Sequence, residues 1–302
     1  MKFLKTAFFL LIICNGARLQ AQSDHIQLGS RQYDILDRLE IKLRTDSVLN
    51  FSAVKPFQRK SITQRLQYIK QLEADGKITL SKVDKYNIDL LLLDNFDQNP
   101  NLGDTTLKLK SLFSKTIKTN PIYIGVKRGD FSFYITPAFI NNPIGKDNNL
   151  TSGLFNSSRG FYARGQLTKG IGYYIFYTTN QERDPLYVQQ FVATRSAVPG
   201  NGYFKNYKND GYDYFDARGG INFKIAKGID GEFAYDKVFV GNGFRSLIIS
   251  DFSSNFLYLK VNTRLWKFNY YNLFGQMVLQ YWQYFLKKIL LFLSFEPCAL
   301  QE

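Results

Sequence analysis

Residues 211–274 read GYDYFDARGGINFKIAKGIDGEFAYDKVFVGNGFRSLIISDFSSNFLYLKVNTRLWKFNYYNLF, a stretch with four runs in which apolar and polar residues alternate. In the first run the apolar positions are Ile221, Phe223 and Ile225, with polar residues between them. Alternation with a period of two places one set of side chains on each face of a β-sheet. Runs of about ten residues are long for a soluble sandwich and match strands that cross a bilayer at a tilt. We therefore expect transmembrane strands of an outer-membrane β-barrel.

The same pattern extends back to Thr105, and its turns follow a regular order. Short turns are expected at 127–130, 169–170, 227–228 and 264–267, and they alternate with long connections at 141–159, 181–212 and 237–255. Barrels of this kind have short periplasmic turns and long outer loops. The predicted fold class is mainly β, an antiparallel transmembrane meander β-barrel, whose aromatic girdles would use the 20 Tyr and 27 Phe. A large aromatic β-sandwich is the alternative.

The start of the chain predicts export. Residues 1–21 have the pattern of a signal peptide, with Lys2 and Lys5 before an apolar run and the small residue Ala21 at the cleavage site. The expected location is the cell outer membrane. Because Cys14 lies in this leader, the exported chain would keep one thiol and have no internal disulfide.

Residues 22–103 have a helical period and predict a small periplasmic helical bundle. Within it, Ser61 and Gln64 have the spacing of a capping box, and Ser81 with Asp84 marks the start of a further helix. The bundle would be a plug or a docking platform for a periplasmic partner. Alternatively, it only shields the mouth of the barrel.

The number of strands predicts an incomplete barrel. Residues 104–276 supply about nine strands, whereas a single-chain bacterial barrel closes with an even number of eight or more. Residues 277–302 lose the alternation and have the pattern of an aromatic helix. We expect a chain that is truncated at its C-terminus, with an out-of-frame tail. The alternative is a sheet that closes with other chains.

Charge and residue types restrict the partners and the chemistry. The formal net charge is +14, which favours an acidic partner such as lipopolysaccharide phosphates or an anionic glycan, and the export signal argues against nucleic acid. The single histidine, His25, is expected to be disordered, and zinc sites and Ser-His-Asp chemistry are excluded. Glu232 and Asp236 lie four strand residues apart, about 13 Å, which is too far for glycoside hydrolysis. We predict no enzyme, no cofactor and no metal.

Basic and aromatic residues of the lumen and the outer loops are the candidate glycan ligands. Aromatic rings can stack on sugar faces, while Lys and Arg can meet uronate or phosphate groups. The alternative is that loop 181–212 folds into the lumen and only packs there. The candidates are Arg164, Arg183, Tyr187, Arg195, Tyr203, Lys205, Arg218 and Arg245.

A glycine-rich loop follows the strand that ends at Asp236. Such a loop binds phosphate when it opens a helix, but this one leads into an apolar segment and further strand. We predict instead a structural bend where the loop folds inward over the lumen. Arg245 would hold an acidic sugar, or it would pair with Asp236 or Asp251. The motif consists of Asp236, Gly241, Gly243, Arg245 and Ser246.

The same loop carries a resemblance to a known family. The chain resembles the Wzi-type capsule-assembly outer-membrane family, and more closely its Bacteroidota branch, which includes gliding-motility-associated relatives. The resemblance implies a barrel of about eighteen strands, of which this chain has about half, with a periplasmic helical bundle. It covers about residues 24–277 and is carried by 236–246 (DKVFVGNGFRS), 247–251, 257–274, 33–41 (YDILDRLEI), Val54-Lys55-Pro56 and 176–180.

The resemblance also implies a role in holding capsular polysaccharide at the cell surface, and with the residue pattern it predicts an outer-membrane protein that tethers or organises this polysaccharide without chemistry. Its partners would be an anionic capsular or surface polysaccharide and outer-membrane lipid or lipopolysaccharide. One alternative is a gliding-motility or adhesion component that acts through periplasmic or motility-machinery proteins. Another is a diffusion porin.

Overall fold

The structure is a computed structural model, and it describes residues 25–44, 54–98, 105–108, 124–147, 150, 153–168, 170–208, 210–241, 243, 245–265 and 268–276. The expected signal peptide at 1–21 and the expected tail at 277–302 lie outside the described residues.

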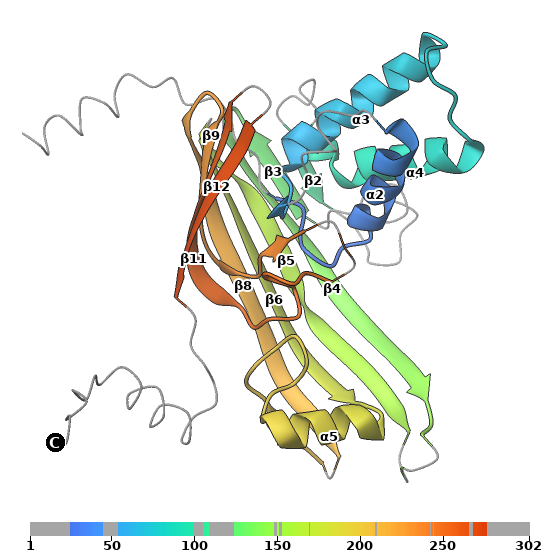
Figure 1. Ribbon diagram of the computed structural model, residues 1–302, viewed down its shortest axis with the longest axis vertical. Coiled ribbons are helices and arrows are strands. Elements are labelled where there is room, and N and C mark those ends of the chain that lie inside the picture. Colours follow the sequence, from blue (N-terminus) through green and yellow to red (C-terminus); the bar gives the residue numbers. More distant parts are fainter. Residues whose placement is uncertain are drawn as a thin grey trace, which may run out of the picture.

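One large antiparallel sheet dominates the fold (Figure 1). Its strand order, β2-β3-β4-β5-β6-β8-β9-β11-β12, follows the chain order, and the short β7 pairs with β8. This confirms the predicted mainly β fold and the antiparallel meander, although the described strands do not close into a barrel. The strands are β2 (Thr105–Lys108), β3 (Ile124–Arg128), β4 (Phe131–Gly145), β5 (Leu154–Thr168), β6 (Ile171–Arg183), β7 (Lys205–Tyr207), β8 (Gly211–Ala226), β9 (Ile229–Asp236), β11 (Phe256–Leu265) and β12 (Phe268–Gln276).

A helical bundle precedes the long strands, as predicted. It consists of α2 (Gln32–Leu43), α3 (Arg59–Ala74), α4 (Lys82–Asp94) and the 3-10 turn η2 (Phe96–Gln98), packed around buried Leu and Ile side chains. The bundle lies near the short-turn end of the sheet, where Gln58 Nε2 donates to Asp230 Oδ2 at 2.9 Å (Figure 1). None of the helices in the described ranges is both long enough and apolar enough to span a membrane.

The start of α4 matches the prediction, whereas the start of α3 does not. Ser81 is the N-cap of α4, and it exchanges hydrogen bonds with Asp84 in a capping box. The N-cap of α3 is Gln58 instead, and it makes no side-chain cap, so the capping box predicted at Ser61 is wrong. Helix α3 begins earlier because Gln58 is already fixed by its hydrogen bond to Asp230 and by its pairing with His25.

Asp84 ties two helices together. Its side chain is only 1% exposed, and it accepts hydrogen bonds from Arg38 Nε at 2.9 Å and from Lys42 Nζ, both on α2. Burial raises the pKa of Asp84, but the hydrogen bonds from Lys42, Ser81 and Arg38 outweigh burial and hold the pKa well below its usual range. The ionised carboxylate is therefore part of the folded bundle.

Asp84→Asn should destabilise the bundle by about 2 kcal/mol at neutral pH, because it weakens the cap and removes the charge that faces two cations. The folded pKa is depressed, so the stabilisation is present above the ordinary carboxyl pKa of about 4 and is lost as pH falls below it. Hydrogen exchange of α2 and α4 in the full chain measures the difference. If the difference in hydrogen exchange between the parent protein and Asp84→Asn stays the same in strong acid, the ionised Asp84 carboxylate is not what stabilises the bundle.

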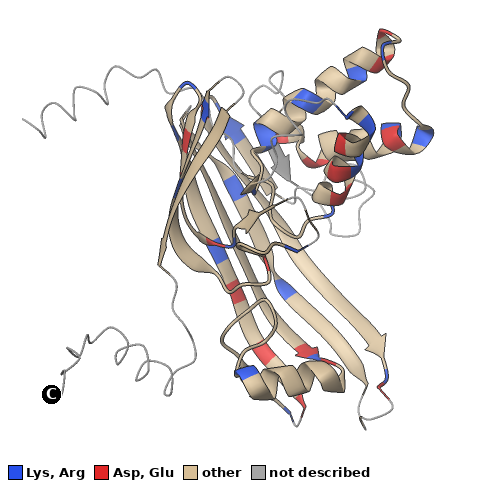
Figure 2. Cartoon of the chain, viewed as in Figure 1, with Lys and Arg blue, Asp and Glu red and all other residues tan. Residues whose placement is uncertain are grey.

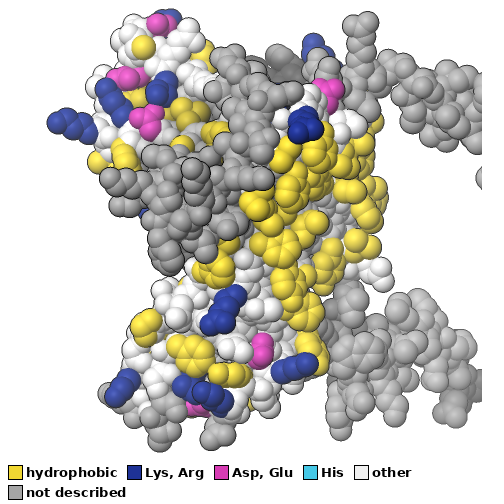
Figure 3. Space-filling model, turned by 180° about the vertical axis from the view of Figure 1, so that it is seen from behind, with side chains coloured by type: hydrophobic (Ala, Val, Ile, Leu, Met, Phe, Trp, Pro, Cys, Tyr) yellow, Lys and Arg dark blue, Asp and Glu magenta, His cyan; other side chains and the backbone are white. Residues whose placement is uncertain are grey.

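The two faces of the sheet have opposite polarity, and the apolar face is the exposed one. Ile175 is 50% exposed on β6, whereas Asn222 and Glu232 on the other face are 0% and 1% exposed. Figure 3 shows the exposed face as a broad band of hydrophobic side chains. Further members of this band are Phe131, Phe139, Leu167, Tyr177, Phe215, Ile221, Ile225, Phe233, Tyr235, Leu257, Leu265, Phe268, Tyr270 and Phe274.

The polar face, called the inner face below, is covered by segments outside the large sheet. The bundle covers it at the short-turn end, and the segment after β9 folds back over it, where β10 (Phe239–Val240) pairs with β1 (Val54–Lys55). Helix α5 (Leu186–Arg195) lies near the opposite end (Figure 1). Figure 2 shows charged residues along the strands as well as on the helices. Several of those on the inner face are paired with one another, as described next.

Candidate functional site

A cavity of ≈ 300 Å³ lies on the inner face, between the sheet and the segment that follows α5. Four neighbouring strands supply its floor, because inner-face side chains recur at every second position of each strand. Residues 199–201 and Lys237 supply the wall. The lining residues are Ala138, Ile140, Ser158, Phe176, Thr178, Asn180, Pro199, Gly200, Asn201, Tyr214, Asp216, Arg218 and Lys237.

Arg218 is the central cation of this cavity, and carboxylates neutralise it. Its Nε lies 3.1 and 3.0 Å from the two carboxylate oxygens of Asp216, and its Nη2 donates to Asp216 Oδ2 at 2.7 Å. Asp236 adds a second carboxylate at 3.8 Å. The guanidinium also lies 4.6 Å from the ring centroid of Phe176. Arg218 is therefore held rigidly by charge on one side and by an aromatic ring on the other.

Lys237 fixes the wall of the cavity. Its ammonium donates to the carbonyl of Gly200, which joins the end of β9 to the segment after α5. Burial and the neighbouring Arg218 lower the pKa of Lys237, although nearby carboxylates, including that of Asp216, oppose the shift. The lysine is thus used for a structural contact and is balanced by its acidic neighbours.

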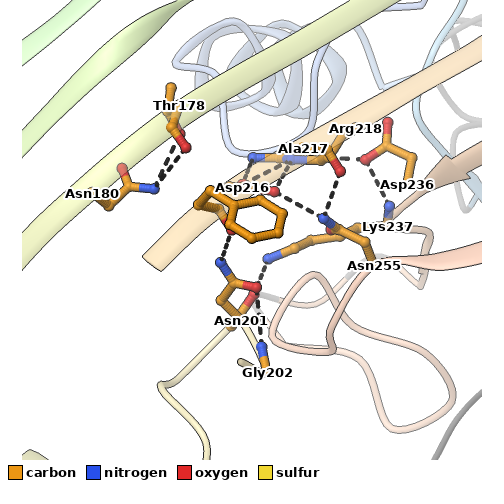
Figure 4. Close-up of polar contacts among 12 residues, drawn as sticks. Thr178, Asn180, Asn201, Gly202, Asp216, Ala217, Arg218, Asp236, Lys237 and Asn255 are labelled. Carbon is orange, nitrogen blue, oxygen red and sulfur yellow. Dashed lines mark hydrogen bonds and ion pairs between the residues drawn. The ribbon is translucent and has the colours of Figure 1, made fainter. Parts of the chain in front are cut away.

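Two asparagines complete this polar network (Figure 4). Asn255 Nδ2 donates to Asp216 Oδ1 at 2.8 Å and to the carbonyl of Ala217 at 3.1 Å. Asn201 Nδ2 donates to the carbonyl of Phe215 at 2.9 Å. Both long connections are therefore pinned to β8, and the cavity between them is preformed.

The floor of the cavity retains hydrogen-bonding capacity. Asn180 Nδ2 donates to Thr178 Oγ1 at 3.1 Å, and both side chains are buried on β6. Among the described contacts Thr178 Oγ1 only accepts, so its proton can serve a further acceptor. Figure 4 shows the two side chains facing the same space as Asn201.

Three of the predicted glycan ligands are committed to internal ion pairs. Arg164 pairs with Asp97 of the bundle at 2.8 Å, and Arg183 pairs with Asp210 at 2.6 Å. Arg218 pairs with Asp216 as described above. Their charges are used within the fold, and of the three only Arg183 lies in loop 181–212, for which internal packing is the alternative prediction.

The other five predicted ligands, Tyr187, Arg195, Tyr203, Lys205 and Arg245, are exposed. The structure brings two of them together across α5 and the segment after β10. Arg195 lies 6.0 Å from the ring centroid of Phe191, Phe191 lies 6.3 Å from that of Phe252, and Arg245 lies 5.2 Å from Phe252. We call Arg195, Phe191, Phe252 and Arg245 the outer-loop patch. Phe252 could not be predicted from the sequence, because it lies in a loop that has no periodic pattern of apolar residues.

The loop motif forms a compact turn over the inner face. Ser246 Oγ donates to the carbonyl of Val240 and accepts from the amides of Ile248 and Ile249 at 3.0 and 3.2 Å. Gly241 has a φ of 139°, which disfavours side chains, and Gly243 follows it in the turn. At the base of the loop Asp236 contacts Arg218, where the sequence had suggested Arg245.

A buried ionic cluster links the bundle to the sheet. Glu232 on β9 lies 3.3 Å from His25 Nδ1 and 2.5 Å from Lys260 Nζ. His25 is buried, so the prediction that it is disordered is wrong. It is ordered because it pairs with Gln58 and because its carbonyl accepts from Arg59 Nε at 3.2 Å.

The side chains of Glu232 and Asp236 lie closer together than the strand spacing predicts. The hydroxyl of Tyr174 lies 3.4 Å from Glu232 Oε1 and 2.6 Å from Asp236 Oδ2, so the two oxygens are no farther apart than the sum of these distances. Tyr174 can reach both carboxylates because its neighbour on β8 is Gly220, which has no side chain. A Cβ at that position would lie 3.0 Å from the tyrosine ring. Strand spacing separates the backbones, but the side chains converge. Both carboxylates are buried and paired.

Comparisons of the chain with protein-family models, with curated proteins and with solved structures find no match. The resemblance described above therefore stays a prediction.

Proposed function

We propose that this chain is a Wzi-like outer-membrane protein that spans the bilayer with its large sheet and tethers an anionic surface polysaccharide without chemistry. The inverted polarity of the sheet is the observation that supports this most strongly. Its exposed face carries large apolar side chains such as Ile175, while its inner face buries Asn222 and Glu232. A sheet in water exposes its polar face, whereas a barrel in lipid exposes its apolar face.

The positions of the turns give the proposed orientation. The short turns and the bundle would face the periplasm, and α5 with the outer-loop patch would face the outside. In this orientation two cations and two rings are presented to the surface glycan. Arginine beside an aromatic ring suits a sugar that bears uronate or phosphate groups.

The deciding experiment is deletion of the gene in its own capsule-forming host, with complementation by the full chain. We expect polysaccharide to be released from the cells into the medium. Loss of surface motility with the capsule retained would support instead a gliding or adhesion component that acts through protein partners. Ion conductance of the purified protein in planar bilayers would support a diffusion porin.

The double variant Arg195→Ala/Arg245→Ala should weaken binding of an acidic polysaccharide about tenfold or more, because two exposed cations are lost. Its binding should also depend less on salt, since fewer charges remain to be screened. Binding is measured on purified protein at two salt concentrations. Arg65→Ala is the matched control, because Arg65 lies 4.6 Å from the ring centroid of Tyr68 on the bundle, at the other end of the molecule. Equal losses in both proteins would exclude the patch as the binding surface.

A further inference from the structure

We infer that the inner-face cavity between β6, β8 and residues 199–201 binds an uncharged sugar residue of the surface glycan. The inference rests on the proposed function, and it adds that the glycan contains neutral sugar residues as well as acidic ones. The outer-loop patch would take acidic groups, and the cavity would take a neutral ring.

The charges of the cavity select against an acidic sugar. Its two cations, Arg218 and Lys237, are matched by two carboxylates, Asp216 and Asp236. Arg218 already makes its short hydrogen bonds to Asp216, and Lys237 donates to a backbone carbonyl. Both cations already have partners, so a uronate placed here would gain no new ion pair. It would also lie close to the Asp216 carboxylate. A neutral ligand avoids this repulsion.

The uncharged groups of the cavity suit hydroxyl-rich ligands. Thr178, Ser158, Asn180 and Asn201 offer hydroxyl and amide groups, which both donate and accept as sugar hydroxyls do. The rings of Phe176 and Tyr214 supply apolar surface beside them. A mostly apolar wall with a few convergent polar groups is the usual composition of a small-molecule site.

The size and position of the cavity fit a short part of a chain. Its volume of ≈ 300 Å³ lies at the lower end of the range for ligand pockets, roughly 300–1,000 Å³, which suits one or two rings. Residues 199–201 belong to the segment after α5, and α5 carries Phe191 and Arg195 of the outer-loop patch. The network of Lys237, Asn201 and Asn255 holds this wall in place before any ligand arrives, which lowers the entropic cost of binding.

The test uses the full chain purified in detergent micelles and saturation-transfer NMR. The probes are the methyl glycosides of glucose, galactose and mannose, with methyl glucuronide as the charged counterpart. At least one neutral glycoside should receive saturation from the protein and should bind more tightly than the glucuronide. Absence of transfer to all three neutral glycosides, or preference for the glucuronide, would overturn the inference.

Two variants of cavity residues test whether the sugar binds in this cavity. Thr178→Val should weaken binding of the neutral glycoside roughly fivefold, because it removes one hydrogen-bonding group. Ala138→Leu should abolish binding, because the larger side chain fills the cavity. Thr179→Val is the matched control, because Thr179 is the next residue of β6 and is exposed on the opposite face. If both cavity variants bind as the control does, the sugar lies elsewhere and the inference fails.

A parallel measurement with an acidic polysaccharide separates the two proposals. If the neutral glycosides do not bind while the polysaccharide still binds through Arg195 and Arg245, the cavity proposal is wrong and the proposed tethering function is retained. If both ligands fail to bind, both proposals fall.

Discussion

Ile175→Lys will prevent the sheet from inserting stably into a bilayer. Ile175 is 50% exposed, and it lies in the middle part of β6, on the apolar face of the sheet. If this face contacts lipid, a lysine there costs about 2–4 kcal/mol near the bilayer centre. The neighbouring positions across the strands, Ala163 and Gly219, offer no counter-charge. We expect the variant to remain largely uninserted.

The measurement is folding of the full chain into liposomes, followed by urea titration. Ile41→Lys is the control, because Ile41 is 76% exposed on α2 of the bundle, outside the proposed membrane region. It should fold as the parent does. If Ile175→Lys folds like Ile41→Lys and the protein stays monodisperse without detergent, the apolar band does not face lipid and the aromatic β-sandwich becomes the better fold.

Local patterns were sufficient to predict the sheet. The structure has the alternation around Ile221, the short turns at 127–130 and 227–228, and the capping box at Ser81 as expected, and each depends on residues close in sequence. The apolar set also lies on one face, as period two requires. The sequence does not predict which segments fold over the other face, because those contacts join distant parts of the chain.

The failures follow from such distant contacts. His25 is ordered by its contacts with Gln58 and Arg59, and it lies against Glu232, which is far along the chain on β9. The two carboxylates of that strand converge because a tyrosine from β6 passes over a glycine of β8. Residue type, strand face and loop position are the only local grounds for predicting which arginines bind a glycan. The sequence contains no local sign that Arg164 would meet Asp97 of the bundle while Arg195 would lie at the surface.

The same long-range cluster makes Glu232 sensitive to substitution. Glu232 is 1% exposed, and it faces both His25 and Lys260, which are buried as well. Removing one member of a buried ion pair leaves an uncompensated charge and costs about 3–5 kcal/mol. We expect Glu232→Gln to loosen the contact between the bundle and the sheet, since His25 anchors the chain that enters the bundle.

Hydrogen exchange of the full chain will show this as faster exchange in β9, β11 and the segment around His25. Lys260→Met added to Glu232→Gln should restore much of the protection, because the unpaired ammonium is then removed. The control is Asp89→Asn, which breaks the exposed pair with Lys70 at 2.7 Å and should change stability by less than about 1 kcal/mol. Equal effects of Glu232→Gln and Asp89→Asn would mean that the buried cluster does not hold the bundle, and that the apolar contact of Phe239 with the bundle core holds it instead.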